Sequence, residues 1–130
     1  MSAPEAPPDL DAVLALPGLE RYAYFVAQVA RREEAWGLVA AGWAVQSDGH
    51  GTSAIGLWPA PEYARLCATD AWRDYVASAI PLRALLHQLL PALEDEGLWV
   101  LVFPTPTARG VLVNPASLAD ELTHARPSAS

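Results

Sequence analysis

The spacing of apolar residues predicts two long amphipathic helices. Between residues 17 and 34, apolar side chains recur every three or four positions, the period at which one face of a helix is buried. Polar residues, including Arg21, occupy the other face. The same period returns from Pro81 in a leucine-rich stretch that contains Leu82, Leu85, Leu86, Leu89 and Leu93. Proline has no N–H for the helical hydrogen bonds, so we expect Pro91 to kink or end this second helix.

Shorter apolar runs between and after these helices predict strands. Some of them alternate with smaller or polar residues, as a half-buried strand does. The run at residues 98–103 is apolar without alternation, which is typical of a central strand covered on both faces. A short helix is predicted at residues 61–69 and a last helix after Asn114, because asparagine caps helix starts. The predicted strands are residues 36–40, 43–45, 54–58, 98–103 and 111–113, and residues 72–76 form either a further strand or an irregular edge.

This order of elements predicts a single α+β domain. Neighbouring strands joined by short turns favour antiparallel pairing, and the longer helical connections allow one parallel pair. We therefore expect one mainly antiparallel sheet of about five or six strands, with the helices packed on one face, over residues 17–125. Residues 1–16, which are rich in Pro and Ala, are predicted to form a flexible arm, and residues 126–130 a disordered tail.

Charge and cysteine content narrow the environment and the partner. Eight basic residues, all arginine, stand against fifteen acidic ones, which gives a net charge of −7 at pH 7. Nucleic-acid binding is disfavoured because it depends on basic residues that displace counterions, whereas charge complementarity favours a basic protein partner. No apolar run approaches the roughly 20 residues of a membrane span, no signal-peptide pattern opens the chain, and Cys67 is the only cysteine. We expect a cytoplasmic protein that binds neither nucleic acid nor membrane.

The ionisable residues do not form a pattern that is typical of catalysis or metal binding. His50, His87 and His124 have no metal-ligand spacing to one another or to Cys67, and Cys67 lies on the apolar side of a predicted helix, where thiols are usually inert. The three consecutive carboxylates at residues 94–96 lack the alternating spacing of a calcium loop. The sequence therefore predicts no catalytic, cofactor-binding or metal-binding residues.

Five tryptophans, at positions 36, 43, 58, 72 and 99, are the unusual feature of the composition. Indole combines a large apolar area with an N–H that needs a partner, so these residues either pack in the core and on sheet faces or line a groove. Prolines in the segment 58–63 (WPAPEY) stop strand pairing there and leave aromatic rings at the end of a sheet. The predicted interaction surface consists of Trp58, Pro59, Glu62, Tyr63, Trp72, Phe103 and Arg109, with Arg109 as its charged anchor.

Several of these residues also carry a likeness to a known family. The matching pieces are residues 21–25 (RYAYF), Trp36, Gly42 and Trp43, residues 57–64 (LWPAPEYA), Trp72, Ile80, Leu90 and Pro91, residues 102–106 (VFPTP), and Gly110 and Val111. On these pieces the chain resembles, over residues 20–122, the uncharacterised bacterial family called domain of unknown function 2750. The resemblance implies a small cytoplasmic bacterial protein, and it implies no activity or site residues.

The sequence leaves three kinds of function open. The acidic charge, the aromatic corner and the lack of a catalytic pattern favour a non-enzymatic protein-binding module, similar in size and charge to immunity proteins that inhibit a toxin or to accessory proteins. The alternative is a small-ligand-binding domain with a Trp-lined pocket and no resident cofactor. A hydrolase or transferase, whose reacting groups only the fold brings together, is the third. Homo-oligomerisation through an exposed edge strand also stays open.

Overall fold

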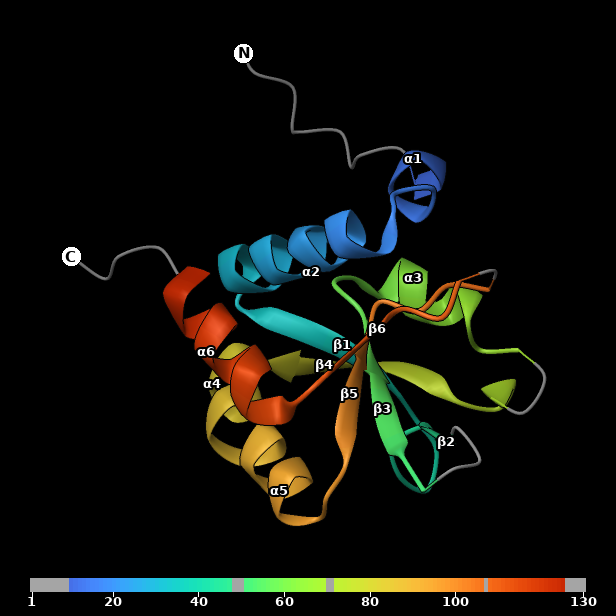
Figure 1. The fold of residues 1–130 in the computed structure, drawn as a ribbon. Coiled ribbons are helices and arrows are strands. Elements are labelled where there is room, and N and C mark those ends of the chain that lie inside the picture. The colour runs from blue at the N-terminus through green and yellow to red at the C-terminus, as the bar shows by residue number, and fades with distance from the viewer. Residues whose placement is uncertain (1–9, 48–50, 70–71, 107, 126–130) are drawn as a thin grey trace.

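The α+β class is confirmed by a computed structural model, which describes residues 10–47, 51–69, 72–106 and 108–125 (Figure 1). Residues 1–9 of the predicted arm and the predicted tail at 126–130 lie outside the described residues. The elements follow the order α1 (Leu10–Leu14), α2 (Gly18–Arg32), β1 (Glu34–Val39), β2 (Val45–Ser47), β3 (Ser53–Leu57), α3 (Pro61–Leu66), β4 (Val76–Pro81), α4 (Leu82–Ala84), η2 (Leu85–Leu89), α5 (Leu90–Asp95), β5 (Trp99–Val102), β6 (Val111–Val113) and α6 (Pro115–Ala125).

The strands form two sheets where the sequence pattern predicted one. β1 and β4 form an antiparallel pair, and the second sheet has the order β2-β3-β5-β6. In the second sheet β3 and β5 are parallel, and the other two pairings are antiparallel. β1 and β2 are both antiparallel to β3: β2 pairs with its first residues, and Trp36 of β1 exchanges two backbone hydrogen bonds of 2.8 Å with Trp58, just beyond its end. Residues 40–44 form a turn between β1 and β2, so these two strands lie along β3 as separate segments.

The local structure around β4 differs from the prediction. Residues 72–75 form a turn in which the Tyr75 N–H donates to the Trp72 carbonyl, so the predicted strand at 72–76 is wrong and β4 begins where that turn ends. Pro81 is the last residue of β4, opposite Glu34 of β1, and it is also the N-cap residue of the leucine-rich helix, which begins at Leu82. The sequence of β4, VASAIP, has small residues without clear alternation, so its strand conformation depends on pairing with β1.

The leucine-rich helix continues past Pro91. α4, η2 and α5 follow one another without a break from Leu82 to Asp95. η2 is a π-helical turn, in which the Leu90 N–H donates to the Leu85 carbonyl five residues earlier. Pro91 has no N–H to donate to the helix. The π-helical turn before it accommodates Pro91, because the backbone hydrogen bonds there are already shifted from the α-helical pattern.

α2 and α6 pack against each other (Figure 1), α2 also contacts β6, and Leu118 and Leu122 of α6 share the buried core with β5. α3 packs elsewhere, against β1 and β4. Residues 10–16, predicted as part of the arm, form α1 and a turn, and Val13 of α1 is buried in the core. The Asn114 cap is confirmed, since its side-chain oxygen accepts a 2.8 Å hydrogen bond from the Ala116 N–H. The buried centre includes Phe25, Val29, Ile55, Leu57, Val100, Val102, Leu118 and Leu122.

The lengths of the described helices can be compared with the length that a membrane span requires. Within the described ranges, no helix has the length and apolar character that crossing a membrane requires.

Candidate functional site

The aromatic rings of the predicted interaction surface lie mostly in the interior. Trp58 and Phe103 are fully buried, and Tyr63 is buried as well. Pro59 is also buried, and Trp72 is half-buried; only Glu62 and Arg109 of the predicted set are exposed. The structure therefore brings Trp58, Tyr63 and Phe103 together, but as interior packing, and it leaves the two charged residues at the surface.

Trp58 is satisfied inside the protein by one carbonyl group. Its indole N–H donates a 2.8 Å hydrogen bond to the Pro104 carbonyl. Its ring lies over Gly56, so closely that a Cβ atom on Gly56 would come within 2.7 Å of it. A glycine two residues earlier on the strand thus makes room for the ring, because residues i and i+2 share one face. Trp58 holds the segment after β5 against the end of β3.

Arg21 is a buried charge that the helical pattern assigned to the polar face of α2. Its side chain is only 4% exposed. The guanidinium donates from Nε to the Phe103 carbonyl at 3.0 Å and from Nη1 to the Leu16 carbonyl at 2.7 Å, and it lies 5.8 Å from the centre of the Phe103 ring. Burial lowers the pKa of Arg21. Phe103 has a φ of +53°, a left-handed conformation that is uncommon for a side chain of this size, and Arg21 stabilises the backbone there.

Three aromatic rings complete this interior cluster. The ring centres of Tyr63 and Phe103 are 4.8 Å apart, and Tyr24 lies 6.5 Å from Tyr63 and 6.3 Å from Phe103. Burial, followed by the neighbouring Tyr24, raises the pKa of Tyr63. We call Arg21, Tyr24, Trp58, Tyr63, Phe103 and Pro104 the motif cluster. All six belong to the pieces on which the family likeness rests, and together they join α2, α3 and the ends of β3 and β5.

Cys67 is held in its neutral form beside the motif cluster. Its thiol lies 3.4 Å from the Pro104 carbonyl oxygen, and burial raises its pKa from 9.0 to about 11. At pH 8 we expect native Cys67 to be alkylated by iodoacetamide roughly 100-fold more slowly than the same thiol in urea, because the thiolate is the reacting form. Mass spectrometry of time points measures both rates. Equal rates in the two states would contradict the buried, neutral thiol.

The remaining ionisable residues form no metal-binding group in the part of the chain that the structure describes, although the Tyr22 hydroxyl donates a hydrogen bond to the Glu121 carboxylate. His87 on η2 and His124 on α6 are both exposed. Across the described ranges, no three His, Cys, Asp or Glu side chains lie close enough to bind a metal ion. The carboxylates at 94–96 are exposed at the end of α5.

A second surface lies on the face of the four-stranded sheet opposite α2 and α6. Strand register places two rows of side chains there: Gln46, Ala54 and Trp99 in one, and Gly56, Leu101 and Leu112 in the other. Gly56 is covered by the ring of Trp58, so we call the other five residues the open sheet face. Trp99 is 37% exposed and Leu112 is 47% exposed, whereas their inward neighbours Val100 and Val102 are buried. The predicted cover on both faces of β5 is therefore incomplete.

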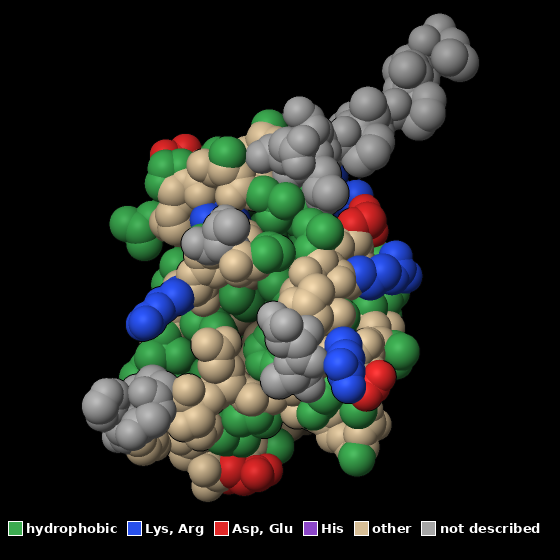
Figure 2. Space-filling view, turned by 90° about the vertical axis from the view of Figure 1, so that its right-hand side faces the viewer, with side chains coloured by type: hydrophobic (Ala, Val, Ile, Leu, Met, Phe, Trp, Pro, Cys, Tyr) green, Lys and Arg blue, Asp and Glu red, His purple; other side chains and the backbone are tan. Residues whose placement is uncertain are grey.

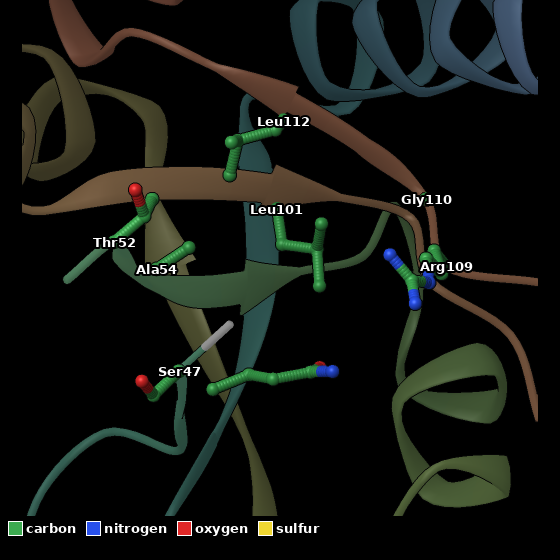
Figure 3. Close-up of a pocket in the computed structure, with 8 residues that line it drawn as sticks. Ser47, Thr52, Ala54, Leu101, Arg109, Gly110 and Leu112 are labelled. Atoms are coloured by element: carbon green, nitrogen blue, oxygen red, sulfur yellow. The ribbon is translucent and has the colours of Figure 1, made fainter. Parts of the chain in front are cut away.

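The open sheet face contains a hollow of about 360 Å³. Figure 3 shows Leu101 in its middle, Thr52 and Ala54 on one side, and the guanidinium of Arg109 turned toward it from the opposite side. Gly110 positions Arg109: it has a φ of +83°, and a Cβ atom there would lie 2.7 Å from the Val102 carbonyl oxygen. The lining residues are Gln46, Ser47, Thr52, Ala54, Leu101, Arg109, Gly110 and Leu112.

Among the described residues that line the hollow, Arg109 is the one that carries a charge. The floor of the hollow is apolar, and its described lining includes neutral polar side chains but no His, Cys or carboxylate. Arg109 makes no ion pair with any residue that the structure describes. Figure 2, a view of the side where α3 and β2 lie, shows hydrophobic side chains in the middle and arginines around them.

Sequence reasoning found Arg109 and missed the rest of this surface. The sequence marks Trp99 only as one of five tryptophans, it places Leu101 on a strand expected to be covered on both faces, and it places Leu112 on the predicted strand 111–113 without indicating exposure. The residues that point in and out of β5 are equally apolar, so hydrophobicity does not separate its two faces. Ala54 on β3 is the available signal, since a small side chain leaves space above a strand, whereas the space over Gly56 is filled by the ring of Trp58.

Comparison with known proteins gives one match. The family described as "Protein of unknown function (DUF2750)" matches residues 22–122, which include every strand of the fold. No curated protein and no solved structure matches the chain.

Proposed function

The chain belongs to the DUF2750 family of proteins of unknown function, and from this premise we propose that it is a non-enzymatic binding module whose open sheet face holds a partner protein. The observation that carries the proposal is the exposure of Trp99 and Leu112 beside a 360 Å³ hollow with Arg109 at its edge. Trp and Arg are the residue types most often responsible for binding energy in interfaces. Exposed apolar side chains that gather on one surface mark interaction sites more often than scattered ones.

The hydrogen-bonding groups of this surface also support binding. The Trp99 indole N–H has no hydrogen-bond partner within the described residues, so a partner protein can accept from it without displacing an internal contact. The described lining has no His, Cys or carboxylate that would act as a general base toward the hydroxyls of Ser47 and Thr52, which favours binding over catalysis at this site. We expect the module to work in the bacterial cytoplasm, where a single unpaired cysteine stays reduced.

The test compares two matched substitutions at exposed leucines. Leu112→Asp places a charge on the open sheet face, and Leu19→Asp places the same charge on α2, where Leu19 is 77% exposed. We expect Leu112→Asp to weaken binding of a purified partner by about 10-fold or more, with Leu19→Asp close to wild type. Partners are first captured from lysate of the source cells on the immobilised domain, and affinities are then measured by calorimetry. Equal affinities for the two variants would overturn the proposal.

A basic partner on the opposite side is a second candidate, favoured by a groove between α5 and α6. This groove has a volume of about 220 Å³ and an apolar floor, with the carboxylates of Glu94 and Asp120 at its sides. Neither helix contains Lys or Arg, so the local charge matches the acidic net charge of the chain. Binding that survives Leu112→Asp and is lost in the Glu94→Lys, Asp120→Lys double variant would favour this second candidate.

A further inference from the structure

The charge of the hollow is opposite to that of the chain as a whole. The protein carries a net charge of −7, yet the one charged side chain among the described lining residues is Arg109. The carboxylates of α5 and α6 line a different groove. The guanidinium is exposed, turned toward the hollow, and without an ion pair to residues 10–47, 51–69, 72–106 or 108–125. An acidic group that enters the hollow therefore meets the positive charge of Arg109, and the described lining contains no carboxylate that would repel it.

From this charge and the apolar floor we infer that the hollow binds an acidic, partly apolar segment of the partner protein, with a carboxylate at Arg109 and an aliphatic side chain against Leu101 and Leu112. The inference rests on the proposed function and adds the chemistry of the partner. A guanidinium presents two parallel N–H donors that match the two oxygens of a carboxylate. The aliphatic part follows from the floor, because Ala54, Leu101 and Leu112 offer no polar side-chain atoms.

The size of the surface favours a peptide segment over a free small acid. Trp99 lies opposite Ala54 in the register of β3 and β5, so its exposed ring extends the apolar area beyond the hollow. A small acid would fill the hollow and leave Trp99 in water, whereas an extended segment can cover both. Burial of a partly exposed Trp adds to affinity through its large apolar area.

The experiment pans a random peptide library against the whole protein and against Arg109→Glu. We expect the wild type to select peptides with Asp or Glu close to Leu, Ile or Val, and the Arg109→Glu variant to select Lys or Arg in place of the acid. For one acidic peptide, the Kd should rise about 10-fold in Arg109→Gln and further in Arg109→Glu, because an unpaired carboxylate then faces a neutral or a like-charged side chain. Arg109 is exposed, so thermal unfolding should be unchanged in both variants, and this serves as the control for folding.

The outcomes separate this inference from the proposed function. If peptides bind Leu112→Asp more weakly but bind Arg109→Gln as well as wild type, the open sheet face remains the binding surface and the acidic partner is overturned. Peptides that ignore both Leu112→Asp and Trp99→Ala would overturn the face itself. A library that yields no binder, together with a small carboxylic acid that binds in an Arg109-dependent way, would overturn the peptide and assign the hollow to a free acid.

Discussion

Replacing Trp58 with alanine is expected to lower the free energy of unfolding by about 3–5 kcal/mol. The side chain is fully buried, so the substitution leaves a cavity over Gly56 that the strand cannot close. The substitution also removes the 2.8 Å hydrogen bond that the Trp58 indole donates to the Pro104 carbonyl. Loss of a donor to a buried carbonyl lowers the free energy of unfolding further. Urea unfolding followed by circular dichroism measures the change, and Trp58→Phe, which keeps most of the ring, should lose less.

Trp99→Ala is the matched control, because it removes the same side chain from the open sheet face. Trp99 is 37% exposed, so only part of its apolar area is lost from the interior and we expect a smaller loss of about 1–2 kcal/mol. Similar losses in the two variants would contradict the assignment of Trp58 to the core and of Trp99 to the surface. The pair also has a practical consequence: loss of partner binding by a Trp58 variant would report unfolding, whereas loss by Trp99→Ala would report contact.

Removal of the buried charge of Arg21 is the second large effect. We expect Arg21→Met to lower the free energy of unfolding by about 1–3 kcal/mol, because the buried Phe103 carbonyl is left without its donor, which costs about that much. The partly buried Leu16 carbonyl also loses its donor and adds a smaller loss. Phe103 also keeps a left-handed backbone conformation, which persists only where the surroundings determine it. Arg21→Lys should recover only part of the loss, since one ammonium group does not reproduce the two-pronged geometry of the guanidinium.

The control for Arg21 is Arg83→Met on α4. Arg83 is exposed, and a surface substitution of this kind usually changes stability by less than about 0.5 kcal/mol. The comparison separates burial from charge, because both variants lose one positive charge. If Arg21→Met unfolds at the same urea concentration as Arg83→Met, the carbonyl contacts of Arg21 do not stabilise the fold.

The family likeness and the proposed binding surface rest on different residues. The pieces that carry the likeness include the motif cluster, whose members are buried or half-buried and hold helices to strand ends. Trp99, Leu101, Arg109 and Leu112 belong to none of those pieces. Membership of the family therefore describes the scaffold, and the function has to be argued from the surface that the scaffold presents.

Local signals were sufficient for many of the elements. The helical period predicted α2, the apolar run predicted β5 and β6, and Asn114 with Pro115 predicted the start of α6. These patterns depend on neighbours within one or two turns of the chain. β4 was misplaced because VASAIP has no strong period, and the separation into two sheets was missed because it depends on the pairing of β1 with β4.

The sequence by itself determined the α+β class, most of the elements, the acidic charge and the family, because composition and periodicity are properties of short stretches. The tertiary structure alone decided which aromatic and charged side chains are inside. Trp58 and Phe103 are interior because carbonyl groups and a guanidinium from distant segments satisfy the polar groups around them. Leu101 and Leu112 line a hollow, and Trp99 is partly exposed on the same face, because α2 and α6 pack on the opposite face of the sheet. Which face of an equally apolar strand receives a helix is a property of the packed chain, and no local pattern carries it.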